Sequence, residues 1–96
     1  MYSRVVTANV LPDKLDEVIR LWRDSVAPAN SQQKGWISAR MLVNRKTGKA
    51  IVVALWETEA DLQASAGPYL QEQLAKFVGL LAAPPVEELF EVAAEG

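Results

Sequence analysis

Four side chains in this sequence could bind or activate a small molecule: Trp56, Asn9, Arg40 and Tyr69. An indole can stack on a flat ligand and donate its N–H, and a carboxamide can hold a carbonyl or a phenol. Trp56 and Asn9 are therefore the candidate catalytic residues. Arg40 could fix an anionic group and Tyr69 could lend a hydroxyl proton, so these two are the candidate substrate-binding residues.

Each candidate also has an ordinary structural interpretation. Trp56 could be a core residue, because buried aromatic side chains dominate small cores. Asn9 could be a polar residue at a strand edge, and Arg40 could be exposed or paired with a surface acid. Tyr69 could pack against a helix break with its hydroxyl in water.

Other kinds of chemistry lack the residues they need. The chain contains no cysteine and no histidine, which removes the thiolate nucleophile, the commonest general base and the usual haem ligand. The acids Glu87, Glu88 and Glu91 lie in an expected strand, where they alternate between faces instead of converging. The sequence therefore predicts no bound metal and no cofactor.

Composition narrows the class of protein further. The 96 residues are half apolar and suffice for one domain with a modest core. The net charge of −2 argues against a nucleic-acid partner, which usually meets a basic face. No apolar run is long enough for a membrane span or a leader peptide, so we expect a cytoplasmic protein.

The segment Lys49–Leu62 organises the expected fold. Seven apolar residues, Ala50 to Trp56, have the length and the β-branched content of one buried strand. Thr58 and Asp61 follow with the spacing of a helix N-cap. A buried strand therefore delivers Trp56 to the start of a helix, where pockets of small α/β domains often form.

The remaining elements follow from periodicity and breakers. Asp13 is expected to cap a helix that Pro28 ends or kinks, and Gly67-Pro68 is expected to divide the later helical region. The expected strands are Tyr2–Leu11, Gly35–Asn44, Ala50–Trp56 and Val86–Val92, and the expected helices span 13–28, 58–65 and 69–81. This β-α-β-β-α-β order predicts a single α+β domain over residues 1–96, a ferredoxin-like fold with a four-stranded antiparallel sheet.

The hairpin between the second and third strands decides which side chains share a face. A three-residue loop with Gly48 left-handed would pair Arg45 with Lys49. Trp56 would then share a face with Arg40 and Leu42, and the other face would be apolar throughout. A four-residue loop would shift the pairing by one residue and exchange these neighbours.

Strand 50–56 is apolar on both sides, whereas the helices of one chain can cover one face only. The uncovered face is large enough to suggest an interface, and we expect a second copy to pack on it, sheet against sheet. A monomer with an apolar surface is the alternative.

The sequence resembles the antibiotic biosynthesis monooxygenase superfamily over nearly its whole length. The residues that carry the resemblance are Gly35-Trp36, the strand end Leu55-Trp56-Glu57-Thr58-Glu59, and Gly79-Leu80-Leu81 followed by Pro84-Pro85. The resemblance implies a dimeric α/β barrel with a pocket between sheet and helices in each subunit. Some members oxidise polyketide-like hydroquinones with O2 and no cofactor, and others bind and degrade haem.

The resemblance assigns site residues unevenly. Trp56 falls on the pocket tryptophan of the cofactor-free members, and Asn9 matches the first-strand asparagine of the haem-degrading members. Val52, Leu62 and Gln71 stand where the cofactor-free members have Asn, Tyr and Arg. The haem-degrading members' axial histidine has no counterpart.

Three functions are consistent with these observations. The first is a cofactor-independent monooxygenase acting on a small aromatic or polyketide-like molecule. The second is a non-enzymatic dimer that binds or senses such a molecule. The third is a structural dimer whose pocket is filled by its own side chains; a cavity beside Trp56 would separate the first two from this one.

Overall fold

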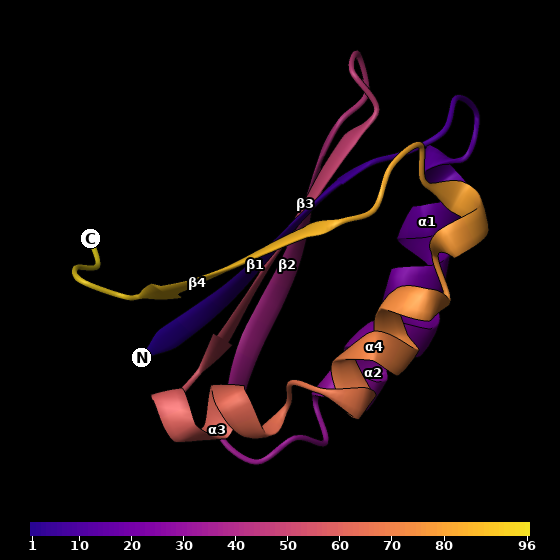
Figure 1. The fold of residues 1–96 in the computed structure, drawn as a ribbon. Coiled ribbons are helices and arrows are strands. Elements are labelled where there is room, and N and C mark those ends of the chain that lie inside the picture. Colours follow the sequence, from indigo (N-terminus) through magenta and orange to yellow (C-terminus); the bar gives the residue numbers. More distant parts are fainter.

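The computed structural model describes all residues, 1–96, as one sheet with helices packed on one side of it (Figure 1). The helical segments between β1 and β2 run without interruption, with a π-helical stretch, η1, in the middle, and η2 is a short 3-10 helix. In chain order the elements are β1 (Tyr2–Asn9), α1 (Leu15–Leu21), η1 (Trp22–Val26), α2 (Ala27–Asn30), β2 (Trp36–Asn44), β3 (Lys49–Trp56), α3 (Glu59–Ala64), α4 (Pro68–Ala75), η2 (Val78–Leu80) and β4 (Val86–Glu91).

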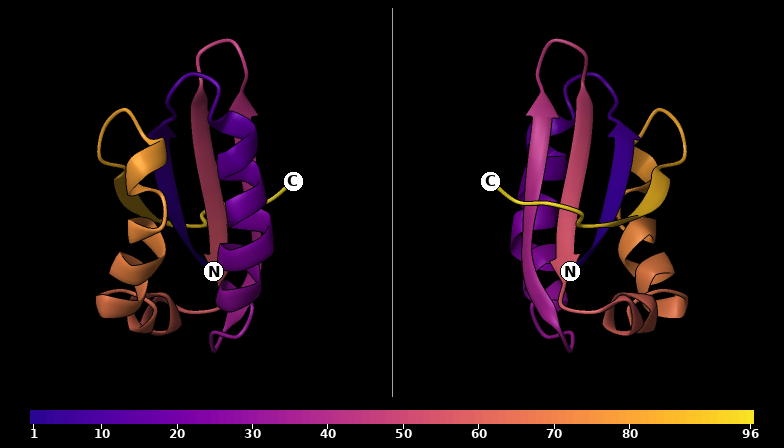
Figure 2. Two further views of the ribbon diagram at one scale, coloured as in Figure 1. Left: turned by 90° about the vertical axis from the view of Figure 1, so that its right-hand side faces the viewer. Right: turned by 90° about the vertical axis from the view of Figure 1, so that its left-hand side faces the viewer.

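The four strands lie in the order β2-β3-β1-β4, and each neighbouring pair is antiparallel. The predicted ferredoxin-like α+β fold is therefore confirmed. Figure 2 shows the two sides of the sheet: the helices cover one side, and the strands face the viewer on the other, with the C-terminal residues passing in front of them. None of the helices has the length and apolar character needed to span a membrane.

The hairpin between β2 and β3 differs from our preferred prediction. Asn44 pairs with Lys49, so the loop has four residues, Arg45 to Gly48, not three. Gly48 does adopt a positive φ of 77°, but Asn44 also caps the loop, because its side-chain oxygen accepts hydrogen bonds from the backbone N–H groups of Lys46 and Thr47. This local Asx-type bonding favours the longer turn.

The longer loop reverses the predicted faces of β2. Directly opposed residues of neighbouring strands point to the same face. Arg40 pairs with Val53 and Leu42 with Ile51, whereas the cavity beneath the helices is lined by Val52, Ala54 and Trp56. Arg40 and Leu42 therefore lie on the face away from the helices, opposite Trp56, and the expectation of a wholly apolar outer face is wrong.

Pro28 lies inside the helix between β1 and β2 instead of ending it. Proline cannot donate a backbone hydrogen bond, and its ring crowds the carbonyl one turn earlier. The π-helical segment η1 precedes it, and the backbone N–H of Ala27 reaches back to the oxygen of Trp22. This wide turn accommodates the proline, so the helix continues to Asn30.

The two expected helix caps had different outcomes. Thr58 caps α3 as predicted, because its hydroxyl oxygen accepts the backbone N–H of Asp61 at 3.1 Å. Asp13 does not cap α1: it adopts a positive φ of 66°, and the N-cap is Lys14, without a side-chain hydrogen bond. The tight turn after Pro12 uses Asp13 for its backbone conformation, which aspartate tolerates better than most residues.

Replacing Gly35 by alanine is expected to lower the free energy of unfolding by about 2 kcal/mol. Gly35 has a φ of +77°, and an added Cβ would lie 2.7 Å from the Cβ of Asp61. The Gly35 carbonyl also accepts the backbone N–H of Glu57, which joins the start of β2 to the end of β3. Urea denaturation followed by circular dichroism measures the loss.

The control for this variant is Gly79→Ala. Gly79 has no positive φ, and nothing lies within 4 Å of an added Cβ. We expect its stability to stay within about 0.5 kcal/mol of the unchanged protein. Equal stability of the Gly35 and Gly79 variants would show that neither the backbone conformation nor the contact with Asp61 constrains this junction.

Candidate ligand-binding cavity

A cavity of about 80 Å³ lies between the sheet and the helices. Side chains from β1, β2, β3, the helical segment before β2, α4 and the chain leading into β4 form its wall. Fourteen of the 18 lining residues are hydrophobic; the lining comprises Arg4, Val6, Ala8, Val18, Trp22, Val26, Asn30, Met41, Ala50, Val52, Ala54, Trp56, Leu70, Gln73, Leu74, Phe77, Leu81 and Pro85.

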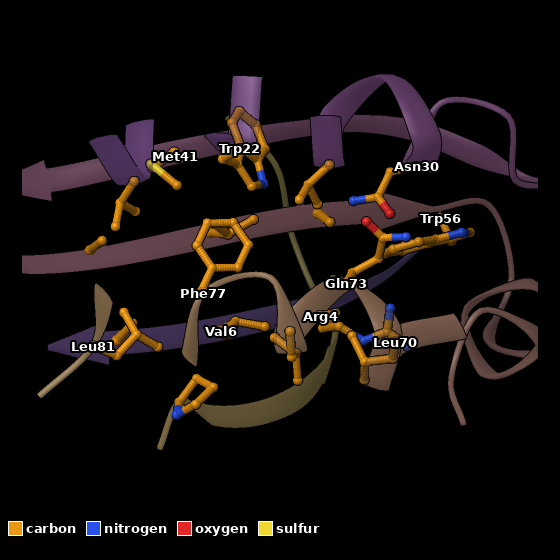
Figure 3. Close-up of a pocket in the computed structure, with 18 residues that line it drawn as sticks. Arg4, Val6, Trp22, Asn30, Met41, Trp56, Leu70, Gln73, Phe77 and Leu81 are labelled. Atoms are coloured by element: carbon orange, nitrogen blue, oxygen red, sulfur yellow. The ribbon is translucent and has the colours of Figure 1, made fainter. Parts of the chain in front are cut away.

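The polar lining residues gather at one end of this cavity. Figure 3 shows Arg4, Asn30 and Gln73 near Trp56, whereas Met41 lies with Phe77 and Leu81 at the far end. Because the residues at the far end are apolar, a ligand would have its apolar body there and its polar group beside Trp56. The cavity therefore has one apolar end and one polar end.

Arg4 is the most constrained side chain at the polar end. It is 5% exposed, although a charged side chain is rarely buried. Its Nε lies 3.1 Å from Glu87, Nη1 donates to the hydroxyl of Ser65 at 2.9 Å, and Nη2 donates to the carbonyl of Leu62 at 3.2 Å. Its guanidinium carbon lies 5.1 Å from the centre of the Trp56 ring, which is the geometry of a cation–π contact.

The electrostatics of this end are nearly balanced. Burial lowers the pKa of the Arg4 guanidinium, and the Glu87 carboxylate opposes that shift. Arginine stays protonated in proteins, so Arg4 and Glu87 form a buried cation paired with a partly exposed anion. The pair adds no net charge to the cavity.

Tyr69 reaches the same end through a second residue. Its hydroxyl donates to Oδ1 of Asn30 at 2.6 Å, and Asn30 lines the cavity. Burial raises the pKa of the Tyr69 hydroxyl, so it stays protonated and able to donate at neutral pH. The arrangement fixes the orientation of the Asn30 carboxamide.

The four predicted site residues are not brought together. Trp56 is 1% exposed and lines the cavity. Tyr69 does not line the cavity, but its hydroxyl donates to Asn30, which does. Asn9 pairs with Lys49 and alternates with the cavity-lining Ala8, so it lies on the outer face with Arg40, where both are exposed. Asn9 and Arg40 therefore do not line the cavity.

Three polar lining residues were not predicted: Arg4, Asn30 and Gln73. Arg4 carried a signal, because it is in phase with Val6 and Ala8 on the helix-facing side of β1, where an apolar residue is the usual choice. Asn30 lies beyond Pro28, where the helix was expected to end or kink, and Gln73 lies within the helix expected over 69–81. Neither the strand nor the helix pattern alone marked these two amides.

Comparisons with known proteins agree with this architecture. A model of the family described as "Antibiotic biosynthesis monooxygenase" matches residues 1–68. The monooxygenase ActVA-Orf6 of Streptomyces coelicolor, solved in complex with nanaomycin D, superposes with a TM-score of 0.83 at 21% identity, covering 98% of this chain and 88% of that one. The protein NE2512 of unknown function from Nitrosomonas europaea has a TM-score of 0.79 at 20% identity, covering 99% and 91% of the two chains. These structural similarities show the fold.

Among curated proteins, the uncharacterised protein Rv2557 of Mycobacterium tuberculosis is 32% identical over 96 residues. That match covers 98% of this chain but 42% of the relative, so the chain spans less than half the length of the curated relative. The family match extends over β1, the helices after it, the β2–β3 hairpin and α3, which include Arg4, Asn30 and Trp56. The chain belongs to the antibiotic biosynthesis monooxygenase family.

Proposed function

We propose that the cavity binds a small, flat and largely apolar molecule, and that the protein oxidises this molecule with O2 without a cofactor. The observation that carries the proposal is the cavity itself, whose wall is apolar except at the end beside Trp56. A core filled by its own side chains, the structural alternative, would leave no such space. The similar ActVA-Orf6 monooxygenase was solved with nanaomycin D, which supports a small organic ligand here as well.

The proposed reaction needs little covalent chemistry from the protein. A ring CH2 group beside an electron-rich phenol loses a proton, and the resulting anion reacts with O2. One oxygen atom becomes the new carbonyl and the other leaves as water, so CH2 and O2 become C=O and H2O. Trp56 contributes the ring that orients the substrate, while its own N–H is fully buried, and the donors at the polar end stabilise the negative oxygen.

Ligand size sets a further requirement. The unoccupied volume of about 80 Å³ is roughly half of the 150 Å³ apolar cavity that accommodates benzene in an engineered protein. A ligand with two or more rings must therefore displace wall side chains. We expect α4, a two-turn helix that begins after the break at Gly67 and carries Leu70 and Leu74 in the wall, to move outward.

The alternative is a protein that binds or senses the same kind of molecule without oxidising it. Two positions that are polar in the cofactor-free monooxygenases support this alternative: Val52 lines the cavity as an apolar residue, and Leu62 is buried against Trp56. A third, Gln71, is exposed and does not line the cavity. At these three positions this chain therefore places no polar group in the cavity where the cofactor-free monooxygenases have Asn, Tyr and Arg.

Oxygen consumption separates the two functions. The purified protein is given a panel of hydroquinones and anthrone-like phenols without added cofactor, beside the variant Trp56→Phe. We expect uptake above the spontaneous rate that falls about tenfold in the variant, because the ring that orients the substrate has changed. Binding without uptake, followed by fluorescence, would contradict the oxygenase and support the binding protein.

We also propose that the protein is a homodimer joined through the outer face of its sheet. That face carries Val5, Ile51, Val53 and Leu55 in the central strands, together with Leu42. Every residue of β4 is exposed, including Phe90 at 47% and Val86 at 59%. Exposed apolar surface of this extent indicates an interface, and a second copy about a two-fold axis buries it on both partners.

Val53→Asp is expected to convert this dimer largely to monomer at about 20 µM protein, or to aggregate it, because it would place an unpaired charge in the interface. Val53 lies at the middle of β3 on the outer face. Light scattering measures the mass. The control Val78→Asp changes a residue that is 74% exposed on the helical side, and it should leave the mass unchanged. A normal dimer in the Val53 variant would contradict the proposed interface.

A further inference from the structure

The side chains of Asn30 and Gln73 each carry a carboxamide at the polar end of the cavity, and in each the NH₂ group has no hydrogen-bond partner in the protein. Oε1 of Gln73 accepts a hydrogen bond from Nζ of Lys76 at 3.1 Å. Because an ammonium group can only donate, this bond fixes which end of the Gln73 carboxamide is oxygen. Oδ1 of Asn30 accepts the hydroxyl proton of Tyr69 at 2.6 Å, so the oxygen of the second carboxamide faces Tyr69 and its amino group has no partner in the protein.

The amino groups of both carboxamides therefore remain as donors. No hydrogen bond within the protein engages Nε2 of Gln73 or Nδ2 of Asn30. Gln73 is 7% exposed as a residue and lines the cavity, and neither nitrogen is among the fully buried side-chain atoms without a partner, so water or a small ligand can reach both. Figure 3 shows the two carboxamides at the same end of the cavity, beside Trp56.

The neighbouring cation does not make this end a site for an anion. Arg4 is already engaged by Glu87, by the hydroxyl of Ser65 and by the carbonyl of Leu62. A ligand that binds with a localised full charge, such as a carboxylate, would have to displace Glu87 or remain without a counter-ion in an apolar cavity, and both are unfavourable. The negative oxygen of the proposed reaction differs, because its charge is delocalised over the ring and N–H donors can stabilise it.

Arg4 is the only cation among the residues that line the cavity, and Glu87 pairs with it, so the lining itself carries no unpaired charge. Lys76, which donates to Gln73, is exposed and lies outside the lining. The polar end therefore offers N–H donors next to the ligand, and no unpaired cation among the lining residues.

We propose that Asn30 and Gln73 are specificity-determining residues that select a ligand with a neutral hydrogen-bond acceptor, a ketone or quinone carbonyl, at one end of an apolar ring system. The inference rests on the proposed function, because it names the ligand class of that cavity. The two carboxamide oxygens already accept hydrogen bonds from Tyr69 and Lys76, whereas the two amino groups have no partner in the protein. These donors favour a carbonyl oxygen over a hydrocarbon edge, which would leave both donors unpaired.

Three matched bicyclic probes test the selection: 1-tetralone, tetralin and tetralin-1-carboxylate. They share an apolar ring system and differ in a neutral acceptor, no acceptor and an anion. Calorimetric titration gives each affinity, and the ¹⁵N–¹H signals of the tryptophan indoles, with Trp56 identified by Trp56→Phe, report whether the probe is in the cavity. We expect 1-tetralone to bind about tenfold more tightly than tetralin, with the carboxylate weakest.

Two variants in α4 test whether Gln73 causes the preference for 1-tetralone over tetralin. Gln73→Leu should reduce the ratio of tetralone to tetralin affinity to about threefold, because one of the two donors is lost while the side chain keeps a similar size. Both affinities are measured in the variant, so that the comparison is made on their ratio. Gln71→Leu, a control on the exposed side of the same helix, should keep the tenfold ratio. Asn30→Leu should lower the ratio as well.

The possible failures are distinguishable. Equal binding of tetralin and tetralone would overturn this inference and leave the proposed binding of apolar rings standing. Tightest binding of the carboxylate would instead identify Arg4 as an anion site and overturn the inference. Binding of none of the three probes would contradict both the inference and the proposed function.

Discussion

Replacing Arg4 by alanine is expected to lower the free energy of unfolding by about 3 kcal/mol. The change removes the cation that pairs with Glu87 and the donors to Ser65 and Leu62, and it empties a space beside Trp56. Removing one member of a buried ion pair usually costs about 3–5 kcal/mol. The lower value applies because the Glu87 side chain is 32% exposed and can turn toward water.

Urea denaturation followed by circular dichroism measures this effect. Arg20→Ala provides the matched control, since Arg20 is an exposed arginine of α1, and we expect a change within about 0.5 kcal/mol. A second variant, Arg4→Met, keeps much of the apolar contact with Trp56 and should recover about half of the loss. If Arg4→Ala were as stable as Arg20→Ala, the buried network would contribute nothing to folding.

Replacing Trp56 by alanine is expected to cost about 4 kcal/mol, the largest effect of any variant considered. The side chain is 1% exposed, packs with Ala54 and Leu62, and carries the guanidinium of Arg4 over its face. The loss combines the transfer of a large aromatic group to water with an enlarged cavity. A loss of that size is a large part of the total stability of a small domain.

Trp36→Ala is the control, because Trp36 pairs with Trp56 across the strands but is only half-buried. We expect it to cost less than half as much. Arg4→Ala combined with Trp56→Ala gives a double-mutant cycle, whose coupling should be about 1 kcal/mol from the cation–π contact. Purely additive losses would show that Arg4 and Trp56 stabilise the protein independently.

Much of the fold could be predicted from local patterns. The apolar run Ala50 to Trp56 predicted the central strand β3, and Gly67-Pro68 predicted the break before α4. These features depend on side-chain periodicity and on backbone conformations that few residues adopt, so neighbouring residues suffice to specify them. The β-α-β-β-α-β order, and hence the fold, followed from them.

The sequence did not determine which side chains of β2 point toward the helices. The faces of β2 depend on whether the loop has three or four residues. In the observed four-residue loop the side-chain oxygen of Asn44 accepts hydrogen bonds from the backbone N–H groups of Lys46 and Thr47. A shift of one residue moves every side chain of a strand to the other face, which is why Arg40 was assigned to the pocket and lies outside it.

The sequence by itself determined that this chain would form one antiparallel sheet with helices on one face, and that Trp56 would lie at the strand end beneath them. Only the tertiary structure decided that Arg4, Asn30 and Gln73 would meet there. They come from β1, from the helix end beyond Pro28 and from α4, so no local pattern relates them. Their hydrogen-bond partners are also distant in sequence, such as Ser65 for Arg4 and Tyr69 for Asn30, and such contacts exist only once the chain has packed.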